Sequence, residues 1–151
     1  MRKGWPLALA GAMVAAAAAG IWLWDKSLSH ADPNDPEQVA LGRQVYAAHC
    51  ASCHGANLEG QPNWRQRLPN GRLPAPPHDA SGHTWHHPDR VLFDITRHGL
   101  AAHAPKGYES DMPGFADALS DKQIWAVLAY IKSEWPPEVR MRQAEITERA
   151  R

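Results

Sequence analysis

Apolar residues fall into one long uncharged run near the start of the chain and three later segments with helical spacing. In the first of these segments Val39, Gly42 and Tyr46 lie at i, i+3 and i+7, which is one face of a helix. Asp35 can cap that helix, and Pro36 stands at its first position, where proline is favoured. The pattern therefore predicts a helix that begins at Pro36.

A second helix is predicted from Asp89 to His98. Its apolar face, at helical spacing, consists of Val91, Leu92 and Ile95. Pro88 precedes this helix, and Gly99 is placed to end it.

The third predicted helix has the clearest signal. Ser120 and Gln123 form a capping box, in which each side chain bonds the backbone of the other residue. Apolar side chains then recur at i, i+3, i+4, i+7 and i+11, namely Ile124, Val127, Leu128, Ile131 and Trp135. Pro136 and Pro137 end the helix, because proline cannot continue one. Residues 136–151 form a charged tail, in which we expect a frayed surface helix.

Residues 55–87 and 100–119 separate the predicted helices and are rich in proline and glycine. Loops of this length usually have a functional reason in a compact domain. The sequence shows no internal repeat and no β-hairpin signal. The predicted fold class is therefore all-α, with three main helices joined by long loops.

The uncharged run is long enough to cross a membrane, since residues 5–24 would span about 30 Å as a helix. Arg2 and Lys3 precede it, and this places residues 1–4 in the cytoplasm and residues after 24 outside. Residues 25–34 are then a linker. The alternative is a cleaved signal peptide, for which Ser29-His30-Ala31 offers small residues, although its apolar region usually has only about 7–15 residues.

The segment Cys50-Ala51-Ser52-Cys53-His54 has the C-x-x-C-H pattern of covalent c-type haem attachment. Thiols three positions apart on one helical turn can each add to a vinyl group of the same porphyrin. The imidazole of His54 then lies under the ring, where it can bind the iron. A redox-active pair would need a βαβ context, and a zinc site would usually need further Cys or suitably spaced His. Haem attachment is therefore favoured, and it agrees with export across the membrane.

The chain has 16 basic and 16 acidic residues, so its formal charge is zero. This balance excludes the basic footprint of a nucleic-acid-binding protein and predicts no strong electrostatic steering of a partner. Both cysteines belong to the haem motif, which leaves none for a structural disulfide.

Residues 35–135 resemble a class I c-type cytochrome. The resemblance rests on the haem motif, on Gly42 and Tyr46 before it, on a Met-Pro pair before the last helix, and on Val127-Leu128-Ala129-Tyr130-Ile131-Lys132 within that helix. It implies the cytochrome c fold around one covalently bound haem c, with the first and last helices crossing at the glycine. The preceding transmembrane helix suggests a membrane-anchored bacterial branch.

The resemblance also implies a methionine as the sixth ligand of the iron, and Met112 holds that position. The other methionines lie at the N-terminus, in the uncharged run or in the charged tail. A Met/His ligand pair raises the potential of the iron and suits electron transfer. The rival is a second histidine ligand, with His98 and His103 the nearest candidates.

Further candidates lie in the first long loop. The segment His83-Thr84-Trp85-His86-His87 could bind copper or zinc, but we favour ordinary loop residues, because spacing alone defines no metal geometry. The indole N–H of Trp85 could donate to a haem propionate or take part in core packing. Pro76 or Pro77 could supply the carbonyl that accepts the other ring N–H of His54.

The predicted function is single-electron transfer at the bacterial inner membrane, with the haem domain on the periplasmic side. Expected partners are membrane or periplasmic redox proteins, such as an oxidase, a reductase or a quinol-oxidising complex. Neither nucleic acid nor a small-molecule substrate is expected. The alternatives are a haem enzyme or sensor with an open or displaceable sixth site, and a copper-handling assembly factor that uses residues 83–87. Signal cleavage would instead give a soluble periplasmic protein.

Overall fold

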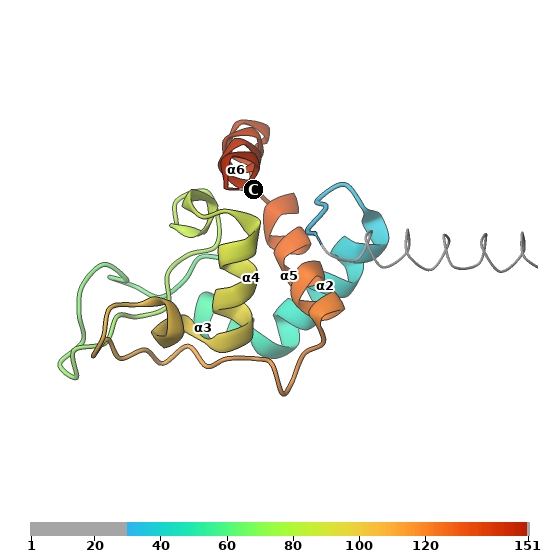
Figure 1. The fold of residues 1–151 in the computed structure, drawn as a ribbon. Helices are drawn as coiled ribbons and strands as arrows, with labels where there is room; N and C mark the ends of the chain where they lie inside the picture. Colours follow the sequence, from blue (N-terminus) through green and yellow to red (C-terminus); the bar gives the residue numbers. More distant parts are fainter. Residues whose placement is uncertain (1–29, 151) are drawn as a thin grey trace, which may run out of the picture. The chain divides into compact units, whose positions relative to one another are not determined.

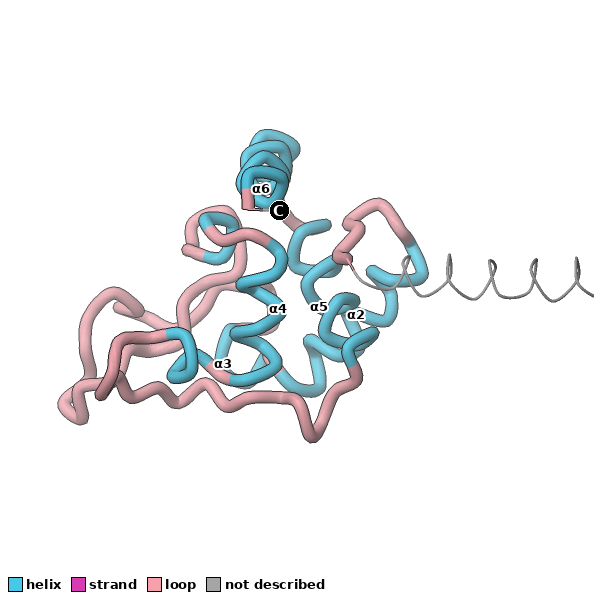
Figure 2. The backbone as a smooth tube through the Cα atoms, viewed as in Figure 1, coloured by secondary structure: helices cyan, strands magenta, loops and turns pink. Residues whose placement is uncertain are grey.

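The computed structural model of the chain describes residues 30–150, and Figure 1 shows its helices. In this part of the chain the long helices are α2 (Pro36–His49), α4 (Asp89–His98), α5 (Asp121–Ser133) and α6 (Pro137–Arg149). Short helices in the connections are α3 (Ala51–His54), η1 (Thr84–His86) and η2 (Leu100–His103). No strand occurs among the described residues, and long loops join the helices (Figure 2). The all-α prediction is confirmed.

Helices α2 and α5 begin where their capping residues predict. The Asp35 carboxylate accepts hydrogen bonds from the amides of Glu37 and Gln38, at 2.9 and 3.1 Å. Ser120 and Gln123 form the predicted capping box at the start of α5. These side chains satisfy amides that have no partner within the helix, and each such cap contributes about 1 kcal/mol.

α2 and α5 cross at Gly42 with no side chain between their backbones. A Cβ atom at Gly42 would overlap the carbonyl oxygen of Ala126 and would lie 2.8 Å from Cβ of Tyr130. The rings of Tyr46 and Tyr130 pack beside this crossing, with 5.4 Å between their centroids. The predicted crossing is confirmed, but the nearest atom comes from Ala126 rather than from Val127.

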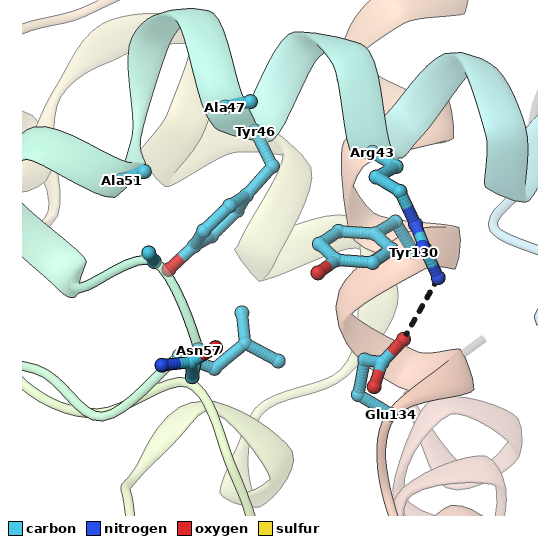
Figure 3. Close-up of a pocket in the computed structure, with 9 residues that line it drawn as sticks. Arg43, Tyr46, Ala47, Ala51, Asn57, Tyr130 and Glu134 are labelled. Carbon is cyan, nitrogen blue, oxygen red and sulfur yellow. Dashed lines mark ion pairs between the residues drawn. The ribbon is translucent and has the colours of Figure 1, made fainter.

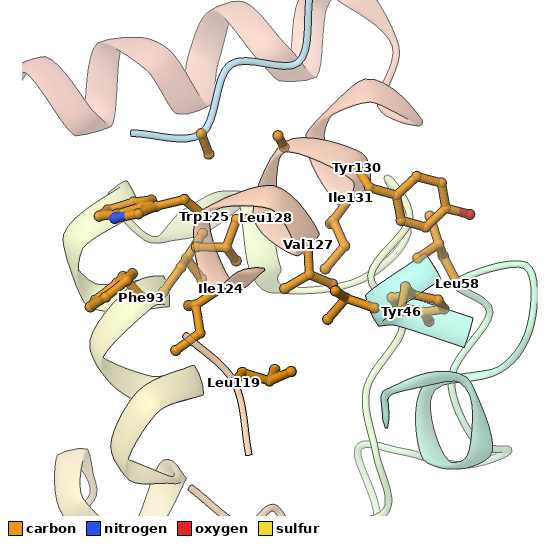
Figure 4. Packing of buried hydrophobic residues seen from close by; sticks show 14 of the residues in the cluster. Tyr46, Leu58, Phe93, Leu119, Ile124, Trp125, Val127, Leu128, Tyr130 and Ile131 are labelled. Carbon is orange, nitrogen blue, oxygen red and sulfur yellow. The ribbon is translucent and has the colours of Figure 1, made fainter. Parts of the chain in front are cut away.

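α5 forms the centre of the core, because every residue from Ile124 to Lys132 is buried. Figure 4 shows the apolar side chains that gather around it from the other helices and the loops. Phe93 of α4 stacks on Trp125, with 4.4 Å between ring centroids. Full burial of one large apolar side chain contributes about 1.5–3 kcal/mol, so several buried side chains on one helix contribute strongly to stability.

α6 is docked on the domain and is not the frayed helix that its charges predict. The buried amide of Gln143 donates to the carbonyl of His87 at 3.1 Å and to the carboxylate of Asp89 at 2.7 Å. The same carboxylate accepts two bonds from the buried ammonium of Lys132, at 2.8 and 3.0 Å. Lys132 also donates to the carbonyl of Ala31 at 2.9 Å. A buried polar network therefore joins α4, α5, α6 and the start of the described chain.

The run expected to cross the membrane, residues 5–24, lies outside the described residues, and so does most of the linker. Within residues 30–150, no helix combines the length and apolar character that a membrane crossing requires. The longest described helix, α2, has 14 residues, whereas a span needs about 20.

Candidate haem-binding site

The haem motif lies at the junction of α2 and α3. The amide of Cys50 donates to the carbonyl of Tyr46, and the amide of His54 donates to the carbonyl of Cys50, both at 2.9 Å. These bonds continue the helical geometry through the motif, as its spacing requires. Both thiols are free, with Cys50 half-buried and Cys53 exposed.

The thiol of Cys50 is not activated. Burial, together with the neighbouring Cys53, raises its pKa to about 11. A nucleophilic thiol of a redox-active dithiol depends on a lowered pKa. Cys50 is therefore not such a nucleophile.

His54 is buried and oriented by a backbone acceptor. Its Nδ1 lies 2.8 Å from the carbonyl oxygen of Pro76. Because a carbonyl only accepts, Nδ1 carries the proton and Nε2 keeps the lone pair that a metal binds. Burial lowers the pKa of His54, against the opposing effect of this hydrogen bond, so the imidazole is neutral at pH 7. The acceptor belongs to Pro76, whereas Pro77 is buried with its backbone against Gly60 and Gly82.

A second imidazole supports the first. The ring of His78 stacks on that of His54, with 3.9 Å between centroids and 24° between planes. Nδ1 of His78 lies 2.6 Å from the hydroxyl of buried Thr84. Burial, with a smaller effect from His54, holds the pKa of His78 well below its ordinary value. No sequence pattern pointed to His78, because a single histidine after two prolines belongs to no periodic face.

Met112 is half-buried in the loop between η2 and α5. Directly after it, the amides of Phe115 and Ala116 donate to the carbonyls of Thr96 and Arg97, both at 3.0 Å. These bonds fix the chain that follows Met112 to the end of α4. Tight anchoring of this kind suits a side chain that must keep one position.

The rival ligands are more exposed than Met112. His98 ends α4 with an exposed side chain, and His103 is exposed in η2. Met141 lies on α6 and is 64% exposed. An axial ligand has to be shielded from water, and this difference in burial favours Met112 over the three others.

The histidines around η1 lie near one another. The ring of His83 is centred 5.3 Å from that of His86 and 4.8 Å from that of His87. Even so, in the described part of the chain no three His, Cys, Asp or Glu side chains are grouped so that they could hold a metal ion. Trp85 stacks on His86 at 3.7 Å, and its indole N–H donates to the carbonyl of Ala80 at 3.2 Å. The described contacts of this segment are therefore ring stacking and hydrogen bonds within the chain.

An open groove lies beside the crossing of α2 and α5 (Figure 3). Side chains of both helices and of residues 56–58 line it, and the ion pair between Arg43 and Glu134, at 3.6 Å, closes one edge. Neither His54 nor Met112 lines this groove. It is therefore separate from the candidate haem ligands.

Comparison with known proteins agrees with this site. Residues 39–135 match the family described as Cytochrome c, which is more than half of the chain and includes the haem motif. A relative named cytochrome c-555, from Prosthecochloris aestuarii, is 30% identical over 110 residues, which cover 66% of this chain and 93% of the relative. No solved structure matches the chain. The chain belongs to the cytochrome c family, whose members transfer electrons through a covalently bound haem c.

Proposed function

We propose that this protein is a membrane-tethered electron carrier with one haem c, whose iron is bound by His54 and Met112. The observation that carries this proposal is the placement of His54, a buried imidazole with Nδ1 bonded to the Pro76 carbonyl and Nε2 left for a metal. A free cysteine pair lies directly before it. The haem supplies single-electron exchange between ferrous and ferric iron.

The residues of the chain then have distinct roles. Cys50 and Cys53 would form the thioether bonds that keep the haem in place. His54 would bind the iron, and its bond to the Pro76 carbonyl would orient the ring and raise its basicity. Met112 would supply a second, soft and neutral ligand that favours the ferrous state. An iron held by both residues would exchange electrons without binding a substrate.

The similarity to cytochrome c-555 supports a carrier rather than an enzyme. We propose that residues 5–24 anchor it in the bacterial inner membrane, with the haem domain on the periplasmic side. Its partners would be membrane or periplasmic redox proteins that donate or accept one electron at a time. The uncharged run of residues 5–24 and the positive residues before it support this location.

Carbon monoxide binding to the reduced protein tests the carrier function. A carrier with both axial sites filled should bind carbon monoxide poorly at neutral pH, whereas an enzyme or gas sensor should bind it readily. Haem staining after denaturing electrophoresis tests the attachment in the same sample. Haem that leaves the chain on denaturation would contradict the thioether bonds, and ready carbon monoxide binding would contradict the carrier.

The location is tested by exporting the protein and sequencing its mature N-terminus. An intact N-terminus in the membrane fraction is the expected result. A mature chain that starts at Asp32 and is found in the soluble periplasmic fraction would contradict the anchor and favour signal cleavage.

A further inference from the structure

The long loop after the haem motif is closed at its base beside His54. The amide of Gln61 donates to the carbonyl of Ala75 at 2.9 Å, and the amide of Ala75 donates to the side-chain oxygen of Gln61 at 3.0 Å. We call residues 61–75 the bridging loop. Its last residue directly precedes Pro76, whose carbonyl accepts from His54. The base of the bridging loop is therefore tied to the proximal ligand.

Further along, the bridging loop holds Arg72 in a tight turn. The amide of Leu68 donates to the carbonyl of Arg72 at 2.8 Å, and the amide of Arg72 donates to the side chain of Asn70 at 3.0 Å. These bonds involve only the backbone of Arg72. Its side chain is free to act elsewhere, and a substitution there leaves the turn intact.

The guanidinium of Arg72 reaches the chain before Met112. Its Nε and Nη2 donate to the carboxylate of Glu109 at 3.2 and 3.1 Å, and its Nη1 donates to the carboxylate of Asp111. Asp111 is the residue directly before Met112. Among the residues that the structure describes, these are the hydrogen bonds that join residues 104–112 to another part of the chain.

The two sides of Met112 are therefore held in different ways. Backbone hydrogen bonds to the end of α4 hold Phe115 and Ala116. Charged side-chain bonds from Arg72 hold Glu109 and Asp111, and these are open to solvent and to salt. The side before Met112 is the weaker attachment, so we expect any opening of the loop to start there.

On the basis of the His54 and Met112 ligation proposed above, we propose that Arg72 is a positioning residue that keeps Met112 on the iron. It acts through Asp111 and Glu109 and does not touch the iron itself. The short stretch from Arg72 to Pro76 would then support both axial ligands. Pro76 supports His54 through its carbonyl, and Arg72 supports Met112 through Asp111. This gives the long loop, which the sequence alone could not explain, a structural role at the site.

The rate of carbon monoxide binding to the reduced holoprotein measures this role. Carbon monoxide binds only when Met112 has left the iron, so its rate follows the open fraction. Exposed charge pairs are weak, and losing both should raise the rate by about two- to tenfold. Arg72→Ala should therefore bind carbon monoxide faster and lose the ferric Met–iron absorption band at a lower temperature. The rate for Arg72→Lys should lie between those of the wild type and Arg72→Ala. A lysine keeps the charge, but its single ammonium cannot replace all the donors of the guanidinium.

Three further measurements separate positioning from general stability. Arg43→Ala removes an exposed arginine paired with Glu134, away from residues 104–112, and should leave the rate unchanged. Glu109→Gln with Asp111→Asn should reproduce the effect of Arg72→Ala without touching the arginine. High salt should speed carbon monoxide binding in the wild type and have little effect in Arg72→Ala.

The outcomes distinguish the two proposals. In one outcome the wild type binds carbon monoxide slowly and keeps the Met–iron band, and Arg72→Ala and the carboxylate variants bind it equally slowly. This would overturn the role of Arg72 but not the Met112 ligation. A wild type that lacks the band and binds as fast as Met112→Ala would overturn the Met112 ligation, and the role of Arg72 with it. An effect of equal size in Arg43→Ala would also overturn the positioning role.

Discussion

The imidazole of His78 lies stacked on that of His54, with 3.9 Å between the ring centroids. His78 is in turn bonded to Thr84, at 2.6 Å between Nδ1 and Oγ1. His54 is thus supported by a chain of side chains that ends in the His83-Thr84-Trp85-His86-His87 segment. Thr84, rather than the histidines around it, links this segment to His54 through His78.

Replacing Thr84 with valine should destabilise the domain by about 1–3 kcal/mol. The change keeps the shape of the side chain but leaves Nδ1 of His78 without its partner in a part-buried position. Denaturant unfolding of the holoprotein measures the loss. Ser81→Ala, which removes an exposed hydroxyl in the same loop, is the control and should change little. Equal midpoints for the wild type and Thr84→Val would contradict the importance of this bond.

His78 should also make stability fall as the medium becomes acidic. Its native pKa lies well below that of an unfolded histidine, about 6.5. Above that pH both states are neutral, and the contribution of His78 is complete. Below it the unfolded chain takes up a proton that native His78 does not, so up to about 1.4 kcal/mol is lost per pH unit. His78→Leu should show a correspondingly flatter fall between pH 6.5 and 5.5, and parallel curves would contradict a His78 that stays neutral in the native state.

Gly42→Val should weaken the crossing of α2 and α5. A side chain there would meet the backbone of Ala126, which cannot move away without separating the helices. Overpacking of this kind costs about 1–3 kcal/mol, and a clash with backbone should reach at least the upper end. Thermal unfolding followed by helical circular dichroism measures it, with Ala40→Val on the exposed face of α2 as the control. A Gly42→Val protein as stable as the control would show that the helices do not meet at this glycine.

The helices were predictable because their signals are local. Asp35, Pro36 and the Ser120–Gln123 box act within a few residues of their own position. The face of α4 was less predictable. Leu92 is buried as expected, but Phe93 and Thr96 are buried with it, whereas Val91 and Ile95 are only half-buried. Packing against α5 decides which side chains of α4 are buried. The periodicity of α4 alone does not predict that packing.

Lys132→Met should destabilise the domain by about 3–5 kcal/mol, because it leaves the carboxylate of Asp89 buried without its cation. Gln143, which also bonds that carboxylate, should then hold α6 less firmly, so α6 should gain proteolytic sensitivity. Lys122→Met, on the exposed start of the same helix, is the matched control. Unchanged stability and unchanged proteolysis of α6 would contradict the role of the network.

The long-range side-chain connections could not be predicted, because they join residues distant in the sequence. Arg72 reaches Glu109 and Asp111 across more than 30 positions, and Lys132 reaches Asp89 across more than 40. The residues next to Arg72 or Lys132 in the sequence do not indicate which carboxylate each side chain binds. The haem motif was predictable for the opposite reason, since the chemistry of attachment requires Cys50, Cys53 and His54 close together.

The ligation of the iron by Met112 is tested most directly by the weak long-wavelength charge-transfer band of a ferric Met–iron bond, compared in the wild type and in Met112→Ala. The wild type should show the band, and the variant should keep its covalent haem but lose the band, because Cys50, Cys53 and His54 remain. Met112→His should lower the reduction potential, since imidazole donates more strongly to ferric iron. A wild type without the band, or a Met112→Ala protein that retains it, would contradict a His54/Met112 electron carrier and turn attention to His98 and His103 as ligands.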